Sequence, residues 1–231
     1  MYDPPISPVR TSSTEPLERL YTDLHLLAVN KPPGVPSQPD ATGDPSVLDL
    51  LGEQGVGLPH RLDRPVSGVL LVSRTPEALR KLNAAFAEQH VAKTYLAMVE
   101  GRLVDAQLEH LLVHDARAHK AHVVPTMRKG ALHAILRVRA LNVGERYSLV
   151  EVRPEGGRFH QIRAQLSAAG HPIKGDVKYG ARRGEPDRSI ALHARSLKFA
   201  HPFTGAPLCI QAPLPGTGLW PRLSQGVDLD R

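Results

Sequence analysis

Short apolar runs separated by proline- and glycine-rich breaks predict buried strands joined by loops. Residues 24–30, LHLLAVN, form an apolar run of strand length, which the prolines and glycine of residues 31–40 end. A second apolar run, VLLVSR at residues 69–74, follows the segment PHRLDRPVSG at residues 59–68. Prolines and a Ser-Gly pair in that segment disfavour a helix, so Asp63 is predicted to lie in a loop between two ordered elements.

Helical spacing of apolar residues predicts an amphipathic helix after the second strand, and residues 47–51 are a shorter helical candidate. Thr75 is a suitable N-cap and Pro76 suits the first turn. The apolar face of the helix that begins after Thr75 consists of Leu79, Leu82 and Phe86.

A later helix is predicted within GGRFHQIRAQLSAAG at residues 156–170, with Gly170 as its stop. The apolar positions with helical spacing are Phe159, Ile162, Leu166 and Ala169. His160 and Arg163 are three residues apart and are expected to face the same way on this helix.

Alternating patterns in the middle of the chain predict further strands. In KTYLAMVEG, residues 93–101, the period of two allows Tyr95 to face a cleft while Leu96 and Met98 face the core. Residues 132–141 and 147–154 alternate as well and are joined by a turn, so they are predicted to pair antiparallel. The overall prediction is an α+β fold with a mixed sheet.

Composition favours one domain with a polyanionic partner. The 231 residues are 41% hydrophobic, enough for one sizeable core, and a net charge of +6 with a pI near 9.7 suits nucleic acid or an anionic membrane surface. No run is long enough to span a membrane and no signal peptide is apparent, so a soluble, cytoplasmic protein, monomeric by default, is expected. Cys209 is the only cysteine, which excludes an internal disulfide.

Residues 1–19 contain four prolines with Ser and Thr and are predicted to form a flexible arm. Residues 20–231 are predicted to form a single domain.

Asp63 is the strongest candidate for chemistry, in the segment His60-Arg61-Leu62-Asp63-Arg64. The two neighbouring guanidinium groups favour the ionised carboxylate even if it is partly buried. An ionised carboxylate held in place can act as a nucleophile or a base, whereas a turn or capping role is the plainer alternative.

Basic side chains recur beside loops and at the ends of elements, as expected if they converge on a phosphate-binding cleft. Scattered solvated charges are the alternative. The candidates for contacts with nucleic acid are Lys31, His60, Arg61, Arg64, Lys93, Arg158, His160 and Lys174.

Signals for a metal or an organic cofactor are weak. The histidines of HLLVHDARAHKAH, residues 110–122, include one i, i+4 pair, but no glutamate is placed as in HExxH and no cysteine is near. Dinucleotide-binding, phosphate-loop and nucleophile-elbow motifs are absent from the sequence. A reaction without a cofactor is therefore the simpler hypothesis.

Five sequence blocks resemble the RluA-type pseudouridine synthases, and the resemblance extends from Leu24 to about Pro213. HRLD followed by SG, in order with HQIR, GD and YG, is specific to this family. The blocks are NKPPGVPSQ (30–38), HRLDRPVSGVLLVSRT (60–75), AKTYLAMVEG (92–101), GGRFHQIRAQLSAAGHPIKGDVKYG (156–180) and LHARSLKFAHPFTG (192–205).

The resemblance implies a pseudouridine synthase fold: a mixed, mostly antiparallel sheet with flanking helices and a central basic active-site cleft. It implies isomerisation of uridine in transfer or ribosomal RNA, without a cofactor. Asp63 would be the catalytic aspartate, Tyr95 would stack on the uracil, and Arg163 would pair with the aspartate. Relatives usually have Thr where Phe159 stands, and a Thr-Gly lead-in where this chain has Pro-Glu-Gly-Gly. Some relatives carry a separate N-terminal RNA-binding domain, for which residues 1–19 are too short. Residues 20–231 are therefore expected to form a single catalytic domain, which would also select the substrate.

Three alternatives stay open at the level of sequence. A binding module would keep the fold and the basic cleft without turnover, although binding alone does not need an aspartate facing phosphates. A base hydrolase would release uracil, but a second carboxylate to activate water is not evident near Asp63. A methyltransferase is disfavoured because no glycine-rich cofactor loop follows the first strand.

Overall fold

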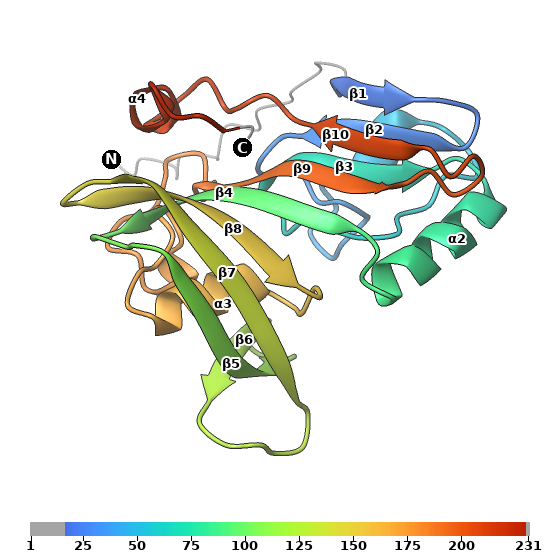
Figure 1. The fold of residues 1–231 in the computed structure, drawn as a ribbon. Helices are drawn as coiled ribbons and strands as arrows, with labels where there is room; N and C mark the ends of the chain where they lie inside the picture. The colour runs from blue at the N-terminus through green and yellow to red at the C-terminus, as the bar shows by residue number, and fades with distance from the viewer. Residues whose placement is uncertain (1–16, 230–231) are drawn as a thin grey trace, which may run out of the picture.

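A single mixed sheet organises the molecule in the computed structural model, which describes residues 17–229 (Figure 1). Its order is β1-β2-β3-β9-β4-β8-β7-β5-β6, and β10 pairs with β9. Only β3 and β9 pair in parallel among the described strands, which confirms the mostly antiparallel α+β prediction. The strands are β1 (Arg19–Thr22), β2 (Leu26–Lys31), β3 (Ser67–Ser73), β4 (Ala92–Glu100), β5 (Ala106–Asp115), β6 (Lys120–Val124), β7 (Ala131–Val143), β8 (Tyr147–Glu155), β9 (Leu192–Ala200) and β10 (Pro207–Gln211).

Both faces of β3 are covered, because its side chains alternate between two apolar clusters. Val69 and Leu71 belong to the cluster that includes apolar residues of α2 (Pro76–Ala87). Leu70 and Val72 belong to the larger cluster on the other face. That larger cluster also holds apolar residues of the Asp63 loop and of α3 (Gln161–Ala168), so this loop and this helix share one core.

The first two helices occur where they are predicted, and each begins after a capping residue. The Thr75 hydroxyl accepts a hydrogen bond from the Ala78 N–H at 3.1 Å, so α2 starts as expected. Ser46 caps α1 (Val47–Leu51) through a capping box with Asp49.

The third helix, α3, begins later than its apolar spacing predicts. His160 has left-handed backbone angles (φ 50°, ψ 26°), which a right-handed helix cannot contain. Phe159 and His160 therefore precede the helix, and their predicted place on its surface is wrong. Gly170, with φ 85°, lies just beyond the C-cap Ala169.

The parallel contact between β3 and β9 explains the Ser-Gly pair after the Asp63 loop. Gly68 is paired with Ala194 and has φ 112°. A Cβ atom at Gly68 would lie 2.2 Å from the Ala194 carbonyl oxygen. Only glycine allows this approach, which places the end of the Asp63 loop against the middle of the sheet.

The predicted strand around Tyr95 is confirmed as β4, with an irregular register between Thr94 and Tyr95. Leu96 and Met98 are buried as expected, and Ala97 and Val99 are buried as well. Tyr95 itself is partly buried and packs against the larger core. Beyond Tyr95 this part of the strand is therefore enclosed on both faces.

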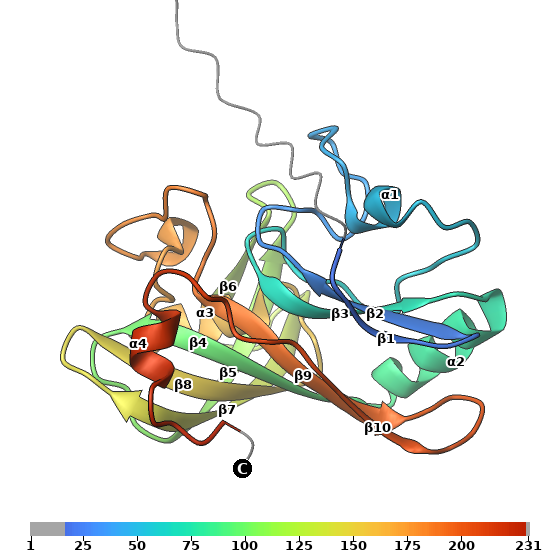
Figure 2. The ribbon, with the colours of Figure 1, turned by 90° about the horizontal axis from the view of Figure 1, so that it is seen from above.

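The two ends of the chain depart from the predicted boundaries in different ways. Most of the predicted arm, residues 1–16, lies outside the described residues. Leu17 packs against the larger core and Arg19 begins β1, so these residues belong to the sheet rather than to an arm. After β10 the chain returns to α4 (Trp220–Ser224) beside β8 (Figure 2), and Trp220 is buried, as its predicted packing role requires.

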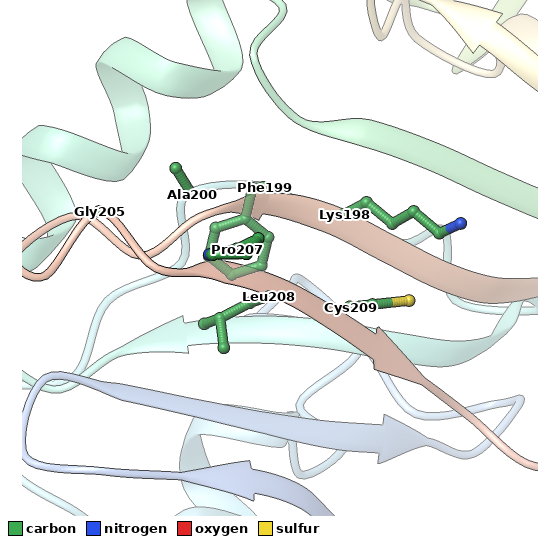
Figure 3. Close-up of a pocket in the computed structure, with 7 residues that line it drawn as sticks. All are labelled: Lys198, Phe199, Ala200, Gly205, Pro207, Leu208 and Cys209. Atoms are coloured by element: carbon green, nitrogen blue, oxygen red, sulfur yellow. The ribbon is translucent and has the colours of Figure 1, made fainter.

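Two surface cavities are lined by residues other than those of the Asp63 loop. One, of about 400 Å³, lies over β9 and β10 and is lined by Phe199, Leu208 and Cys209 among others (Figure 3). The other, of about 330 Å³, lies between the segment after Lys174 and the chain leading into Trp220. Within residues 17–229, no helix is both long and apolar enough to cross a membrane.

Candidate active site

The Asp63 loop is anchored at both sides of the aspartate, and the side chain of Asp63 is left 28% exposed. Leu62 and Val66 are buried in the larger core. The Ser37 hydroxyl donates to the Leu62 carbonyl at 2.8 Å and accepts from the Leu62 N–H at 3.1 Å. The backbone therefore fixes where the carboxylate can lie, while its oxygens can reach a substrate.

Lys31 is fully buried beneath this loop, so its predicted contact with RNA is wrong. Its ammonium donates to the carbonyl oxygens of Pro32 at 2.9 Å, Val35 at 2.7 Å and Arg64 at 3.1 Å. Burial lowers the pKa of Lys31 to about 7, although the charge of Asp63 acts in the opposite direction. Lys31 thus ties the proline-rich loop after β2 to the loop that carries Asp63.

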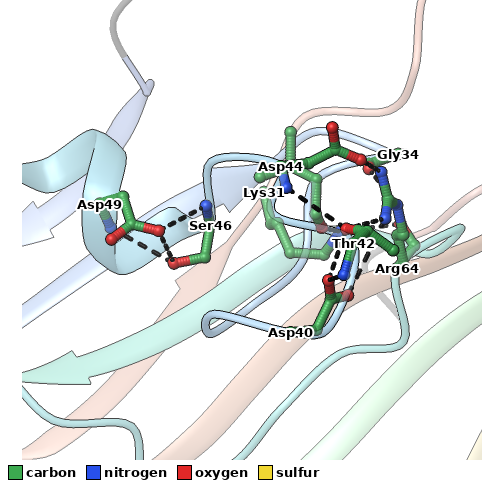
Figure 4. A network of polar contacts seen from close by, with 9 residues as sticks. Lys31, Gly34, Asp40, Thr42, Asp44, Ser46, Asp49 and Arg64 are labelled. Atoms are coloured by element: carbon green, nitrogen blue, oxygen red, sulfur yellow. Dashed lines mark hydrogen bonds and ion pairs between the residues drawn. The ribbon is translucent and has the colours of Figure 1, made fainter.

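Arg64 makes a second tie between the same two loops (Figure 4). Its Nε donates to the Gly34 carbonyl at 2.8 Å and its Nη1 donates to the Thr42 hydroxyl at 2.8 Å. Its Nη2 is ion-paired with Asp44. The guanidinium predicted to bind phosphate is therefore occupied within the protein.

Arg163, on α3, joins two carboxylates of different exposure. Its Nη1 donates to Asp63 Oδ2 at 3.0 Å. Its Nε and Nη2 donate to the two oxygens of buried Asp176 at 2.7 and 2.9 Å. Burial alone would lower the pKa of Arg163, but Asp176 and Asp63 raise it above its ordinary value. Arg163 is therefore a permanent cation beside Asp63.

His160 and Tyr179 complete the cluster around Arg163. His160 Nε2 lies 3.1 Å from Arg163 Nη1 and 3.5 Å from Asp63 Oδ2. His160 Nδ1 lies 2.9 Å from the Tyr179 hydroxyl. Burial lowers the pKa of His160 to about 4 and raises that of Tyr179 to about 12, so both are neutral near pH 7.

Sequence reasoning assigned no role to Asp176 or Tyr179, although both stand in the quoted motif GDVKYG. The motif was the only sequence feature that could have identified them. It did not indicate their partners, because Asp176, directly before η1 (Val177–Tyr179), contacts Arg163 on the separate helix α3.

Tyr95 is the third residue of the predicted catalytic set. It lies at the irregular register of β4, opposite Val152 of β8 and Ala194 of β9. Burial, followed by the negative charge of Asp63, raises the pKa of Tyr95. The phenol therefore keeps its proton at neutral pH.

The other predicted RNA-binding residues fall into two groups. Arg61 and Arg158 are exposed. His60, Lys93 and Lys174 are partly buried and their polar atoms are engaged within the protein. Their partners are the Leu71 N–H for His60, the Gly156 carbonyl for Lys93 and the Glu185 carboxylate for Lys174.

Histidines of the 110–122 segment take separate roles in the structure. His110 lies 3.3 Å from the side-chain nitrogen of Gln165, and His114 packs on Phe159. Within the described part of the chain, no group of three or more His, Cys, Asp or Glu side chains is placed to hold a metal ion.

Known proteins match this chain over most of its length. The profile of the RNA pseudouridylate synthase family matches residues 25–168. The chain is 39% identical over 227 residues to tRNA pseudouridine synthase C of Salmonella typhi, covering 87% of this chain and 86% of that protein. It is 31% identical to ribosomal large subunit pseudouridine synthase D of Pseudomonas aeruginosa, covering 88% of this chain and 70% of that protein.

A solved structure agrees with these matches. Human RNA pseudouridylate synthase domain containing 1 superposes with a TM-score of 0.75 at 27% identity, covering 91% of this chain and 87% of that chain. The fold, the family profile and the identities lead to one conclusion: the chain belongs to the RluA-type RNA pseudouridine synthases, enzymes that isomerise uridine within RNA.

Proposed function

We propose that Asp63 is the catalytic carboxylate of this isomerase, acting on a uridine of transfer RNA without a cofactor. One observation carries the assignment of Asp63. It is the partly exposed carboxylate of the cluster, and it is held by a guanidinium that buried Asp176 fixes in place. A charged, positioned and accessible carboxylate is what the first step requires.

The reaction breaks the bond between ribose and the uracil nitrogen, turns the base and rejoins it through a ring carbon. Asp63 either attacks the anomeric carbon or removes the ribose 2′ proton. Both routes need the ionised form, which Arg163 stabilises. The freed ring nitrogen gains a proton, and the ring carbon that forms the new bond loses one to restore aromaticity. On the second route the 2′ proton also returns to the ribose, so atoms balance without a co-reactant.

The second carboxylate of the cluster argues against hydrolysis. Both oxygens of Asp176 accept hydrogen bonds from Arg163, and its side chain is fully buried. Asp176 is therefore not free to activate a water molecule, as a base hydrolase would require.

Tyr95 is the candidate that would receive the base. A uridine in folded RNA must leave its stack, at a cost of a few kcal/mol. The charge of Asp63 acts on the Tyr95 hydroxyl and helps to keep it protonated. The uncharged ring of Tyr95 offers a stacking surface that would offset part of this cost.

Arg61 and Arg158 are the candidates for contacts with the RNA backbone, because both are exposed and stand close in sequence to members of the cluster. Transfer RNA is the favoured substrate. The chain is 39% identical to tRNA pseudouridine synthase C of Salmonella typhi and covers 86% of it, whereas it is 31% identical to the named ribosomal enzyme and covers 70% of it.

The test uses transfer RNA and ribosomal RNA whose uridines carry tritium on the ring carbon that forms the new bond, taken from a source that lacks the modification. Wild type is expected to release tritium from transfer RNA while the base stays attached, and Asp63→Asn to release none. Glu77→Gln is the matched control, because Glu77 is an exposed residue of α2 ion-paired with Lys81.

Each other outcome would indicate a different substrate, activity or catalytic residue. Tritium release from ribosomal RNA alone would replace the proposed substrate. Free uracil in solution would indicate a hydrolase. RNA binding without release from either substrate would favour the binding module, and full activity of Asp63→Asn would overturn the role of Asp63.

A further inference from the structure

The His160 side chain is held more tightly than a surface RNA contact requires. Its backbone is in the left-handed region, which a residue with a Cβ atom adopts at an energetic cost. Its side chain is 9% exposed. The ring stacks on Phe159 with 3.9 Å between ring centroids, and meets Tyr179 edge to face. Phe159, the departure from the family pattern, thus covers one face of this imidazole.

Arg163 and Tyr179 together determine which nitrogen of His160 carries hydrogen. Arg163 uses Nε and Nη2 on Asp176, which leaves the two protons of Nη1 for other partners. One is donated to Asp63 Oδ2 at 3.0 Å, and the other faces His160 Nε2 at 3.1 Å. A guanidinium only donates, so His160 Nε2 must accept. A proton on Nε2 would put two N–H groups against each other.

The hydrogen bonds of Tyr179 agree with this tautomer. With Nε2 as the acceptor, the neutral imidazole carries its proton on Nδ1 and donates it to the Tyr179 oxygen at 2.9 Å. The same oxygen accepts from the Ala121 N–H at 2.8 Å. Both lone pairs of the hydroxyl are then used, and each contact has one donor and one acceptor.

This arrangement limits how Arg163 can hold Asp63. An arginine often binds a carboxylate through two parallel hydrogen bonds. Here Arg163 makes that paired contact with Asp176, and His160 Nε2 accepts a hydrogen bond from the second N–H of Nη1. Within residues 17–229, Asp63 Oδ1 accepts no side-chain hydrogen bond, so this oxygen is left to meet the ribose.

We propose that His160, kept by Tyr179 with its proton on Nδ1, is a positioning residue that aims Arg163 Nη1 at a single oxygen of Asp63. The proposal rests on the assigned role of Asp63 in the proposed function. It replaces the predicted RNA contact of His160 with a role behind the catalytic carboxylate.

The charges around the imidazole are compatible with a neutral ring. Asp63 and Asp176 favour its protonation, whereas Arg163 and Lys178 oppose it, and burial opposes it most. Burial lowers the pKa of His160 to about 4, so Nε2 is available as an acceptor at neutral pH.

The first test reads the tautomer directly and needs no turnover. The full chain, labelled with ¹⁵N in its histidine rings, is examined at neutral pH by long-range ¹H–¹⁵N NMR, and His160→Gln identifies the signals of His160. A protonated Nδ1 with an unprotonated Nε2 is expected. Protonation at Nε2, or at both nitrogens, would overturn the proposal whether or not Asp63 is catalytic.

The same spectra of Tyr179→Phe test what fixes the tautomer. This variant keeps the aromatic ring and removes the hydroxyl that His160 contacts. A mixture of the two tautomers is expected for His160. An unchanged Nδ1-protonated signal would exclude Tyr179 as the residue that selects it.

The second test separates positioning from folding. His160→Ala should slow single-turnover pseudouridine formation on the order of 10²-fold, with RNA affinity unchanged. His160→Gln supplies an acceptor oxygen near the position of Nε2 and should restore most of the rate. His90→Ala is the control, because the His90 side chain is exposed and pairs with neighbouring Glu88.

Melting temperatures are measured for all three variants. Equal rates for His160→Ala and wild type, or equal losses for His160→Ala and His160→Gln, would contradict positioning. A parallel loss of RNA affinity would restore the predicted RNA contact instead. Asp63→Asn is assayed beside these variants. Full activity of Asp63→Asn would contradict the proposed function, and this outcome is distinct from a failure of the positioning role of His160.

Discussion

Arg163 binds one carboxylate that solvent cannot reach and one that a substrate can. Asp176 supplies two oxygens to it in the interior, and Asp63 supplies one at the edge. A buried guanidinium has lost its hydration, so it depends on the charge that faces it. Asp176 therefore supports the fold and the active site through the same contact.

Asp176→Asn should lower the free energy of unfolding by about 3–5 kcal/mol, because it leaves the buried cation with only part of its compensating charge. Urea denaturation monitored by circular dichroism measures this loss. Glu185→Gln, which weakens the more exposed pair with Lys174, should cost no more than about 1 kcal/mol. Equal losses in the two variants would show that burial of the Arg163 pair is unimportant.

The pairing of Asp63 with Arg163 was predicted better than the surroundings of these residues. Asp63, Tyr95 and Arg163, the proposed catalytic residues, stand in recognisable motifs, and the structure brings Asp63 and Arg163 into contact. Lys31 was expected to contact RNA because it stands beside a loop. Its buried ammonium is bonded to carbonyl groups of Val35 and Arg64, which come from two loops about 30 residues apart in sequence.

Elements followed local pattern where the pattern was complete. Thr75 and the apolar spacing after it placed α2 correctly. The same kind of spacing predicted a start of α3 that was too early. The spacing depends on side-chain type and gives no information on the left-handed backbone of His160. The parallel pairing of β3 and β9 was beyond prediction, since Ser67 and His193 are 126 residues apart.

Gly68→Ala should destabilise the protein by about 3 kcal/mol or more, because the added Cβ atom would overlap the backbone of β9. Gly43→Ala is the matched control. Gly43 also has a positive φ, of 72°, but a Cβ atom there would meet no other atom within 4 Å, so backbone strain alone should cost about 1–2 kcal/mol. Urea midpoints measure both, and similar losses would show that the close approach to Ala194 is not limiting.

Across residues 17–229, four histidines have a pKa below the ordinary value, and the shift is large for His60, His160 and His193. Burial lowers the pKa of His60 to about 3 and those of His160 and His193 to about 4, from 6.5. Between pH 6.5 and 4 the unfolded chain therefore binds protons that the folded chain does not. Stability contributed by these neutral rings is present above pH 6.5 and is lost as pH falls through this window.

The free energy of unfolding should fall by on the order of a few kcal/mol between pH 7 and pH 4.5. In His60→Gln the fall should be smaller, because glutamine can accept the Leu71 N–H without titrating. Urea denaturation at the two pH values measures the difference. An identical fall in wild type and His60→Gln would exclude His60 as a source of acid sensitivity.

The hydrogen bond from Ala121 to Tyr179 has a consequence for how this protein can vary during evolution. Its donor is a peptide N–H of β6, the last strand of the sheet, so the identity of residue 121 does not determine whether the bond forms. Any residue small enough for the buried site supplies it, and only proline removes the donor. The hydrogen bond between the sheet edge and the active site can therefore be kept while residue 121 changes during evolution. Its expected signature among related sequences is the absence of proline at this position.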